Sequence, residues 1–149
     1  MEITGKLEAI WLKRMKGGPM DARQTATLQA GKGIVGNANQ GGKRQVTIIQ
    51  KEVWESLMAQ MGGDLDPAAR RANLMISGRL DLANTIGQVL QIGNCRVRIY
   101  GETKPCEMMD KALPGLREAM KGNWSGGVFG EILDDGQIAV GDPVCWIAE

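Results

Sequence analysis

Residues 89–100, VLQIGNCRVRIY, form the stretch of sequence that decides the fold. They predict two strands, 89–92 and 95–100, joined by a tight turn at Gly93-Asn94, a residue pair that suits hairpin geometry. In the second strand the apolar side chains at positions 95, 97 and 99 alternate with arginines at positions 96 and 98. One face should therefore pack inward while the other meets water, as in a half-buried β-strand.

Short apolar segments and glycines recur on both sides of this hairpin. The chain has 21 glycines spread along its length, which favours many short strands over a helical bundle. We predict further strands at 7–11, 23–28, 46–49, 74–77 and 144–147, a polar loop at 31–42, and a second hairpin of 128–133 and 137–140. Because closing a sheet removes its exposed edges, we expect a mainly β fold, a closed or partly closed β-barrel.

Two segments carry helical signals instead. Residues 51–61 place their apolar side chains on one face at helical spacing, and Gly62-Gly63 ends the run. A second helical region is expected over 105–121, interrupted at Pro114. At 149 residues the chain is long enough for one core and too short for two, so we expect a single domain, 1–149, with a few short helices.

The absence of histidine excludes more chemistry than any other feature of the composition. It excludes Ser-His-Asp and Cys-His nucleophile pairs, His-ligated zinc and imidazole proton shuttles. The 18 basic and 17 acidic side chains give a formal net charge of +1, so any anion site must be local. The three cysteines show no CxxC spacing, and no apolar run is long enough to span a bilayer. We expect a cytoplasmic protein with reduced thiols.

Cys106 differs from the other two cysteines in its sequence setting. It follows Thr103-Lys104-Pro105, where Thr103 is expected to cap a helix and Pro105 to occupy its first turn. Free backbone N–H groups, the helix dipole and Lys104 would then favour the thiolate, which is both a nucleophile and a ligand for soft metals. The alternative is a cysteine buried as a small hydrophobic residue, the interpretation we prefer for Cys95 and Cys145.

Basic residues near two predicted strands form a second candidate site. Arg70 and Arg71 offer adjacent guanidinium groups that bind phosphate in a bidentate manner, and Asn73 offers an amide suited to a polar ring edge. Arg44, which precedes the strand at 46–49, is a further cation for the same anion. The alternative at each position is a solvated charged side chain, because exposed arginines are common.

In their order along the chain, a set of short motifs resembles the stand-alone MOSC domain, named for the C-terminal part of molybdenum-cofactor sulfurase. The resemblance covers nearly the whole chain, and no single motif carries it. The motifs are GGPM at 17–20, GIVG at 33–36, RQVTII at 44–49, RRANL at 70–74, G at 87 with IG at 92–93, PC at 105–106, GGV at 126–128 and GQIAVGD at 136–142.

The resemblance implies a β-barrel similar to that of the family, also described as pyruvate-kinase β-barrel-like, and a functional cysteine at Cys106. In the family this cysteine carries sulfur as a persulfide or ligates molybdenum held by a pterin, the molybdopterin cofactor. The resemblance places Arg70, Arg71 and Asn73 near that cofactor and Arg44 beside them. It also implies reduction of N-hydroxylated compounds for a metal-bound form, and no pyridoxal phosphate in this domain.

Three functions remain open on the sequence alone. The first is a molybdenum-cofactor-associated domain, and the second is a sulfur-transfer protein that uses Cys106 without metal. The third is a non-catalytic adaptor that kept the barrel and lost the cofactor, which is suggested by Asn37, Asn39 and Ser125 where the family pattern has other residues. Expected partners are a sulfur donor or a redox protein, with no nucleic acid and no membrane.

Overall fold

A closed barrel of seven strands forms the centre of the structure, a computed structural model that describes residues 4–147. The strand order is β11-β7-β8-β9-β5-β6-β1, with β11 paired back onto β1 and β2 added beside β1. These strands are β1 (Gly5–Lys13), β2 (Met20–Arg23), β5 (Val46–Gln50), β6 (Leu74–Gly78), β7 (Val89–Ile92), β8 (Cys95–Glu102), β9 (Val128–Ile132) and β11 (Pro143–Ile147). The predicted barrel is confirmed, and all of its pairings are antiparallel except β5 with β6.

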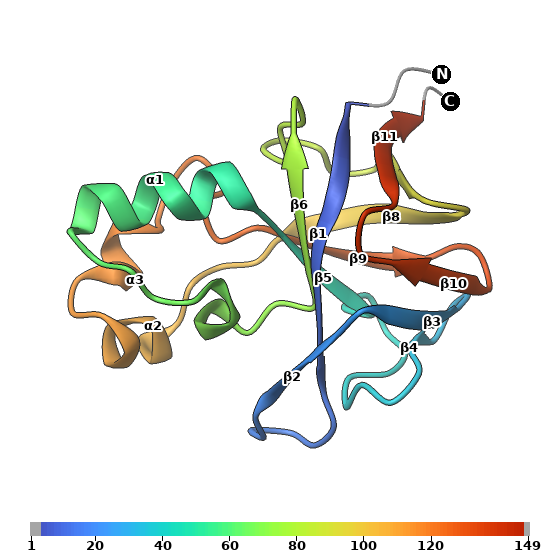
Figure 1. Cartoon of the computed structure of the whole chain (residues 1–149), viewed down its shortest axis with the longest axis horizontal. Helices are drawn as coiled ribbons and strands as arrows, with labels where there is room; N and C mark the ends of the chain where they lie inside the picture. Colours follow the sequence, from blue (N-terminus) through green and yellow to red (C-terminus); the bar gives the residue numbers. More distant parts are fainter. Residues whose placement is uncertain (1–3, 148–149) are drawn as a thin grey trace.

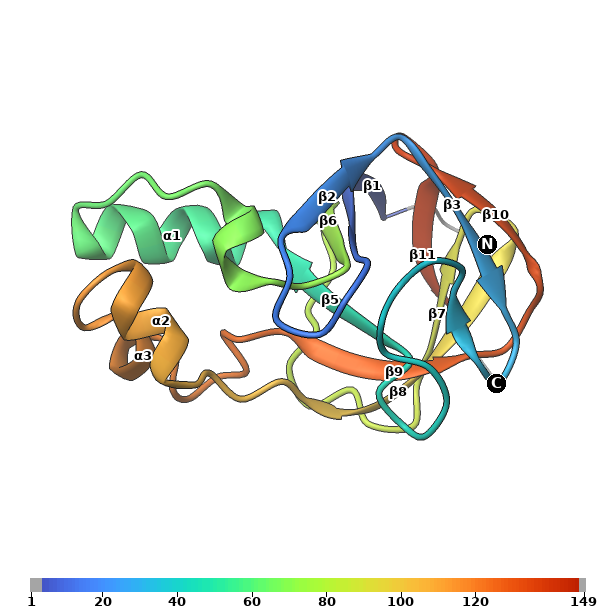
Figure 2. The ribbon, with the colours of Figure 1, turned by 90° about the horizontal axis from the view of Figure 1, so that it is seen from below.

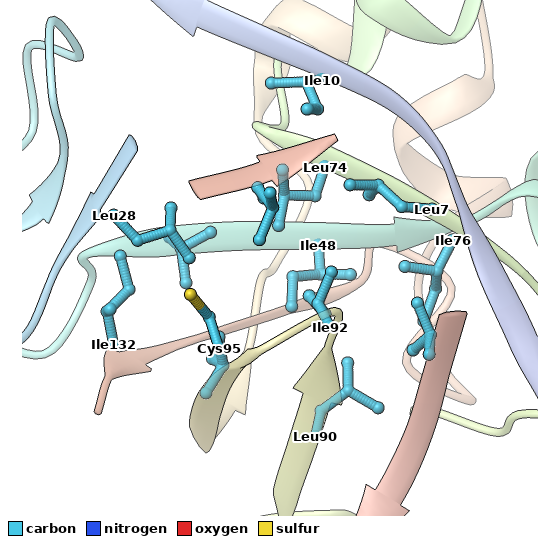
Figure 3. Close-up of a cluster of buried hydrophobic side chains, with 14 of the residues drawn as sticks. Leu7, Ile10, Leu28, Ile48, Leu74, Ile76, Leu90, Ile92, Cys95 and Ile132 are labelled. Atoms are coloured by element: carbon cyan, nitrogen blue, oxygen red, sulfur yellow. The ribbon is translucent and has the colours of Figure 1, made fainter. Parts of the chain in front are cut away.

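The barrel interior is filled by aliphatic side chains that alternate along the strands. Figure 3 shows Leu7, Ile48, Leu74 and Ile92 converging on this interior. The hairpin of β7 and β8 has the predicted register, with Ile92 paired to Cys95 across the turn. Side chains that are removed from water in this way supply most of the favourable free energy of folding.

The predicted strand at 23–28 spans a change of sheet at Gln24: residues 25–28 form a strand as predicted, whereas Arg23 ends the preceding one. The first part is β2, which pairs with β1, and the second part is β3 (Thr25–Gln29). β3 pairs with β10 (Gly136–Ala139) and with β4 (Gly33–Ile34) in a separate three-stranded sheet. The change falls within the polar residues Arg23-Gln24-Thr25, which carry no pattern that marks a change of partner.

The predicted hairpin of 128–133 and 137–140 is also wrong. β9 pairs with β5 and β8 in the barrel, whereas β10 pairs with β3 in the small sheet. The connecting acids are held by other segments: the carboxylate of Asp134 accepts from the Arg96 backbone N–H at 2.9 Å, and that of Asp135 from the Ala30 N–H at 2.7 Å. These bonds direct the chain away from its own strand and towards the small sheet.

The helices gather at one end of the molecule and the small sheet lies at the other (Figures 1 and 2). They are α1 (Lys51–Met61), the 3-10 helix η1 (Pro67–Arg70), α2 (Glu107–Ala112) and α3 (Leu116–Ala119). α1 has the predicted bounds and ends at Gly62, whose φ of 67° is left-handed. Its buried face packs with α2 and α3 in a second apolar cluster. Within residues 4–147, no helix is both long and apolar enough to cross a membrane.

Candidate functional site

A cavity of about 230 Å³ lies where the barrel meets the segments that lead into the helices. All five residues predicted for the site, Arg44, Arg70, Arg71, Asn73 and Cys106, line this cavity. The other lining residues are Lys13, Met20, Asn37, Asn39, Thr47, Ile48, Ile49, Ala72, Thr103, Met108, Met109 and Gly126. The fold therefore brings together residues that are far apart in the sequence, such as Lys13 on β1 and Cys106 before α2.

Arg70 is the most enclosed cation of the cavity, with 7% of its surface exposed. It ends η1, and its Nε and Nη2 donate to the carbonyls of Gly126 at 3.1 Å and Thr103 at 3.0 Å. Burial lowers the pKa of Arg70, and the negative charge of a Cys106 thiolate acts in the opposite direction. Since an arginine stays protonated in proteins, this guanidinium is a fixed positive charge that faces Cys106.

Gly126 has no side chain, which allows Arg70 to bind the carbonyls of two segments that lie close together. A Cβ atom at this position would lie 2.2 Å from the Thr103 carbonyl oxygen and 3.2 Å from Nη2 of Arg70. The close approach therefore needs a residue without a side chain. The sequence pattern GGV at 126–128 thus serves packing between the segment before α2 and the segment before β9, which holds the cavity wall in place.

The other cations reach the cavity from three different segments. Arg71 has a left-handed φ of 65° at the end of η1, and its Nη2 donates to the Gly18 carbonyl at 2.5 Å. The guanidinium carbon of Arg44 lies 5.0 Å from the centre of the Phe129 ring, within the range of a cation–π contact. Lys13, at the end of β1, was not predicted, because its place among these residues depends on strand pairing rather than on any local motif.

Lys13 shows the electrostatic consequence of this grouping. Burial lowers its pKa, and the positive charges of Arg71, Lys16 and Arg44 lower it further. Like charges gather at this site although the whole chain is close to neutral. No aspartate or glutamate is among the described residues that line the cavity. An anion in the cavity would relieve this repulsion.

Asn73 lines the cavity, but its side-chain amide is occupied by the protein. Oδ1 accepts from the backbone N–H and the hydroxyl of Thr47, both at 3.2 Å, and Nδ2 donates to the Trp11 carbonyl and to Oδ1 of Asn37, also at 3.2 Å. These bonds use both acceptor positions and both donors of an amide. Asn73 therefore holds β1, β5 and the loop carrying Asn37 around the cavity.

Cys106 is exposed, while Cys95 and Cys145 are buried. It is the N-cap residue of α2, with an extended backbone, so the predicted position of the thiol at a helix start is confirmed. The predicted cap at Thr103 is wrong, because the helix begins only at Glu107 and Pro105 precedes it. Thr103 instead continues the pairing of β8 with β9, and its N–H donates to the Gly127 carbonyl at 2.9 Å.

The hydroxyl of Thr103 has no hydrogen-bond partner in the structure. The residue is 8% exposed and lines the same cavity as Cys106. A buried hydroxyl without a partner costs free energy, so such groups usually mark a place where a ligand or a water binds. No pattern in the sequence indicated this, because an isolated threonine after a strand has no distinctive signature.

The two other cysteines have the structural role that the sequence predicted. Cys95 projects its sulfur among Leu28 and Ile132 in the barrel interior (Figure 3). Burial raises the pKa of the Cys95 thiol, and the nearby carboxylates of Asp134, Asp142 and Asp135 raise it further. Within the described residues, no group of three or more Cys, Asp or Glu side chains lies close enough to hold a metal ion by itself.

The cavity thus combines an exposed thiol, four cations and an unpartnered hydroxyl. Such a set of groups fits an anion that presents a soft atom, a transition metal or a sulfur, to the thiol. A molybdenum–pterin cofactor, whose phosphate is anionic, meets both requirements. The residues present therefore fit the group that the sequence resemblance implies.

Comparison with known proteins supports the fold and the family. A family model for the MOSC domain matches residues 15–145. The solved YUAD protein from Bacillus subtilis has a TM-score of 0.79 at 20% identity, covering 95% of this chain and 94% of that one. YiiM from Geobacillus stearothermophilus has a TM-score of 0.74 at 14% identity, covering 97% and 75%. YiiM from Escherichia coli has a TM-score of 0.71 at 13% identity, covering 97% and 70%. No protein with a curated description matches the chain.

Proposed function

The chain belongs to the MOSC domain family, and from this premise we propose that it is a molybdenum-cofactor-associated domain that acts through Cys106. The sulfur of Cys106 would either bind molybdenum or carry a transferable sulfur atom. The observation that carries the proposal is the joint presence of an exposed Cys106 and four cations in one cavity without a described carboxylate. A cavity that served only packing would gain nothing from this concentration of like charge.

The cations would have different roles in binding the anionic pterin phosphate. Arg70 is fixed by its bonds to two carbonyls and supplies charge close to Cys106. Arg44, Arg71 and the neighbouring Lys13 would contact the phosphate oxygens, a task to which guanidinium groups are well suited. Asn73 would act as a positioning residue, because its amide bonds hold the strands that carry Lys13 and Thr47.

When bound, the molybdenum centre would supply two-electron redox chemistry suited to the reduction of N-hydroxylated compounds. Cys106 would hold the metal through a soft thiolate, the ligand type that suits it. Met108 and Met109 on α2 would supply apolar surface beside Cys106. We propose a cytoplasmic location and a redox protein or sulfur donor as partner.

Cofactor content tests this proposal. The protein is purified from a host that makes the cofactor, and molybdenum and pterin are measured per chain for wild type, Cys106→Ser, Arg44→Gln and Arg117→Gln. Wild type should carry pterin, Cys106→Ser should lose molybdenum or the extra sulfur atom, and Arg44→Gln should lose pterin. Arg117 is exposed on α3 and outside the cavity, so its variant should match wild type. Wild type without molybdenum, pterin or bound sulfur would favour the adaptor.

A further inference from the structure

The unpartnered hydroxyl of Thr103 is the observation that the proposed cofactor role leaves unused. Every other described polar side chain that lines the cavity deeply has a protein partner: Asn37, Arg70 and Asn73 all make hydrogen bonds. Thr103 is as buried as these residues and makes none through its hydroxyl. It is therefore available to donate to a ligand atom that enters the cavity beside Cys106.

The cations define what such a ligand would be. Lys13, Arg44, Arg70 and Arg71 favour a small anion with several oxygens over a neutral molecule. The cavity volume of about 230 Å³ admits a tetrahedral sulfur oxyanion, which needs roughly 100 Å³ on the scale of about 30 Å³ for a water. With its oxygens among the cations and the Thr103 hydroxyl, such an ion would have one atom left to face the thiol.

We propose that this cavity binds thiosulfate and that Cys106 takes its outer sulfur, so that the protein acts as a thiosulfate-dependent sulfurtransferase. The proposal rests on the sulfur-carrying form of the proposed function and names its donor. A neutral donor would need neither the gathered cations nor the hydroxyl. The four positive charges instead match a donor that enters as a dianion and leaves as a dianion.

The transfer step balances without an oxidant. The Cys106 thiolate attacks the outer sulfur of thiosulfate, and a new S–S bond forms between the two sulfur atoms. The original S–S bond of thiosulfate breaks, and its electron pair leaves with sulfite. Cys106 becomes a persulfide. The total charge is unchanged, because a thiolate and the thiosulfate dianion enter the step and a persulfide anion and the sulfite dianion leave it. The cations stabilise the negative charge that develops on the departing sulfite, as an oxyanion site does.

A thiol or cyanide acceptor would complete the cycle. Cyanide attacks the outer sulfur of the Cys106 persulfide, the S–S bond breaks, and its electron pair returns to Cys106 as the thiolate. The product is thiocyanate, which gives a direct measure of turnover. Because Cys106 is exposed, the persulfide would be open to such an acceptor.

The experiment follows sulfite and thiocyanate release from purified protein given thiosulfate and cyanide at about pH 9, where an ordinary thiol is largely ionised. Mass spectrometry without cyanide should show one added sulfur atom on Cys106. Sodium tetrasulfide, which contains transferable sulfur but no oxygen, is the comparison donor. Cys106→Ser should abolish transfer from both donors.

Thr103→Val separates the proposed binding role from a structural one. The substitution keeps the shape of the side chain and removes a hydroxyl that has no partner, so the variant should be at least as stable as wild type. The kcat/KM for thiosulfate should fall about fivefold or more, as for loss of a hydrogen bond to a charged group, whereas the rate with tetrasulfide should not change. Arg44→Gln should weaken thiosulfate use, and the exposed control Arg117→Gln should not.

Three results would overturn the inference. If tetrasulfide charges Cys106 but thiosulfate does not, the sulfur-carrying function stands and thiosulfate is not its donor. If thiosulfate reacts equally well with wild type, Thr103→Val and Arg44→Gln, the cavity does not bind its oxygens. If neither donor charges Cys106, the sulfur-carrying form fails together with this inference, while cofactor content still tests the metal-binding form on its own.

Discussion

Asn73→Ala should destabilise the protein strongly, because one buried amide connects three parts of the cavity wall. The side chain makes four hydrogen bonds, two with Thr47, one with the Trp11 carbonyl and one with Asn37. At about 1 kcal/mol for each bond, the free energy of unfolding should fall by about 3–4 kcal/mol. That corresponds to a drop in the urea midpoint of about 1.5–2 M, at a slope of about 2 kcal/mol per M.

The assay is urea unfolding followed by tryptophan fluorescence, since Trp11 lies beside the substituted position. Asn39→Ala is the matched control, because Asn39 lines the same cavity and is less buried than Asn73. The control should change the free energy of unfolding by less than about 0.5 kcal/mol. If Asn73→Ala also stays within this limit, or if both variants lose the same amount, the amide does not hold the wall together and its positioning role is refuted.

Three further predictions concern charge and packing. The hydrogen bond from Arg96 lowers the pKa of Asp134. The contribution of the Asp134 carboxylate to stability is therefore present above the ordinary value of 3.8 and is lost as pH falls through the lower folded pKa. Asp134→Asn should weaken the acid dependence of the urea midpoint, and an unchanged dependence would contradict this. The pKa of Lys13 is lowered in the folded protein, so just below 10.5 the unfolded chain binds more protons than the folded one. Stability should therefore rise with pH towards 10.5, and Lys13→Met should reduce this rise as measured by thermal unfolding at several pH values. An identical rise in the variant would contradict the prediction. Trp54→Phe removes the bond from the indole N–H to the Leu65 carbonyl and should cost about 1 kcal/mol in urea unfolding, a loss that a neutral result would disprove.

The elements that the sequence predicted well are those specified by local chemistry. The hairpin of β7 and β8 follows from strict alternation around Gly93-Asn94, and α1 from helical spacing closed by Gly62. Both errors in strand assignment occurred where the chain changes its pairing partner. At Gln24 the chain passes between sheets, and after β9 it is redirected through Asp134 and Asp135. Such choices depend on contacts with distant segments.

The candidate site also contains residues with a local signal in the sequence and residues placed only by contacts between distant segments. Cys106, Arg70 and Arg71 were predicted as site residues because a Pro-Cys pair and an Arg-Arg pair are visible in the sequence. Lys13 and Thr103 were not found as lining residues, because β1 and the end of β8 reach the cavity only through barrel closure. The role expected for Asn73 as a reader of a ring edge remains a prediction from the chemistry of its amide, and the structure adds that this amide already makes four hydrogen bonds within the protein.

The central claim is that Cys106 and the cations of the cavity form one anion site. Comparing alkylation of Cys106 by anionic iodoacetate and neutral iodoacetamide tests it most directly, because the same thiol reacts with both reagents. The account predicts that the iodoacetate-to-iodoacetamide rate ratio at Cys106 is several times that of a small free thiol, and that added salt or Arg44→Gln reduces it. A ratio equal to that of the free thiol, and unchanged by either perturbation, would contradict the claim.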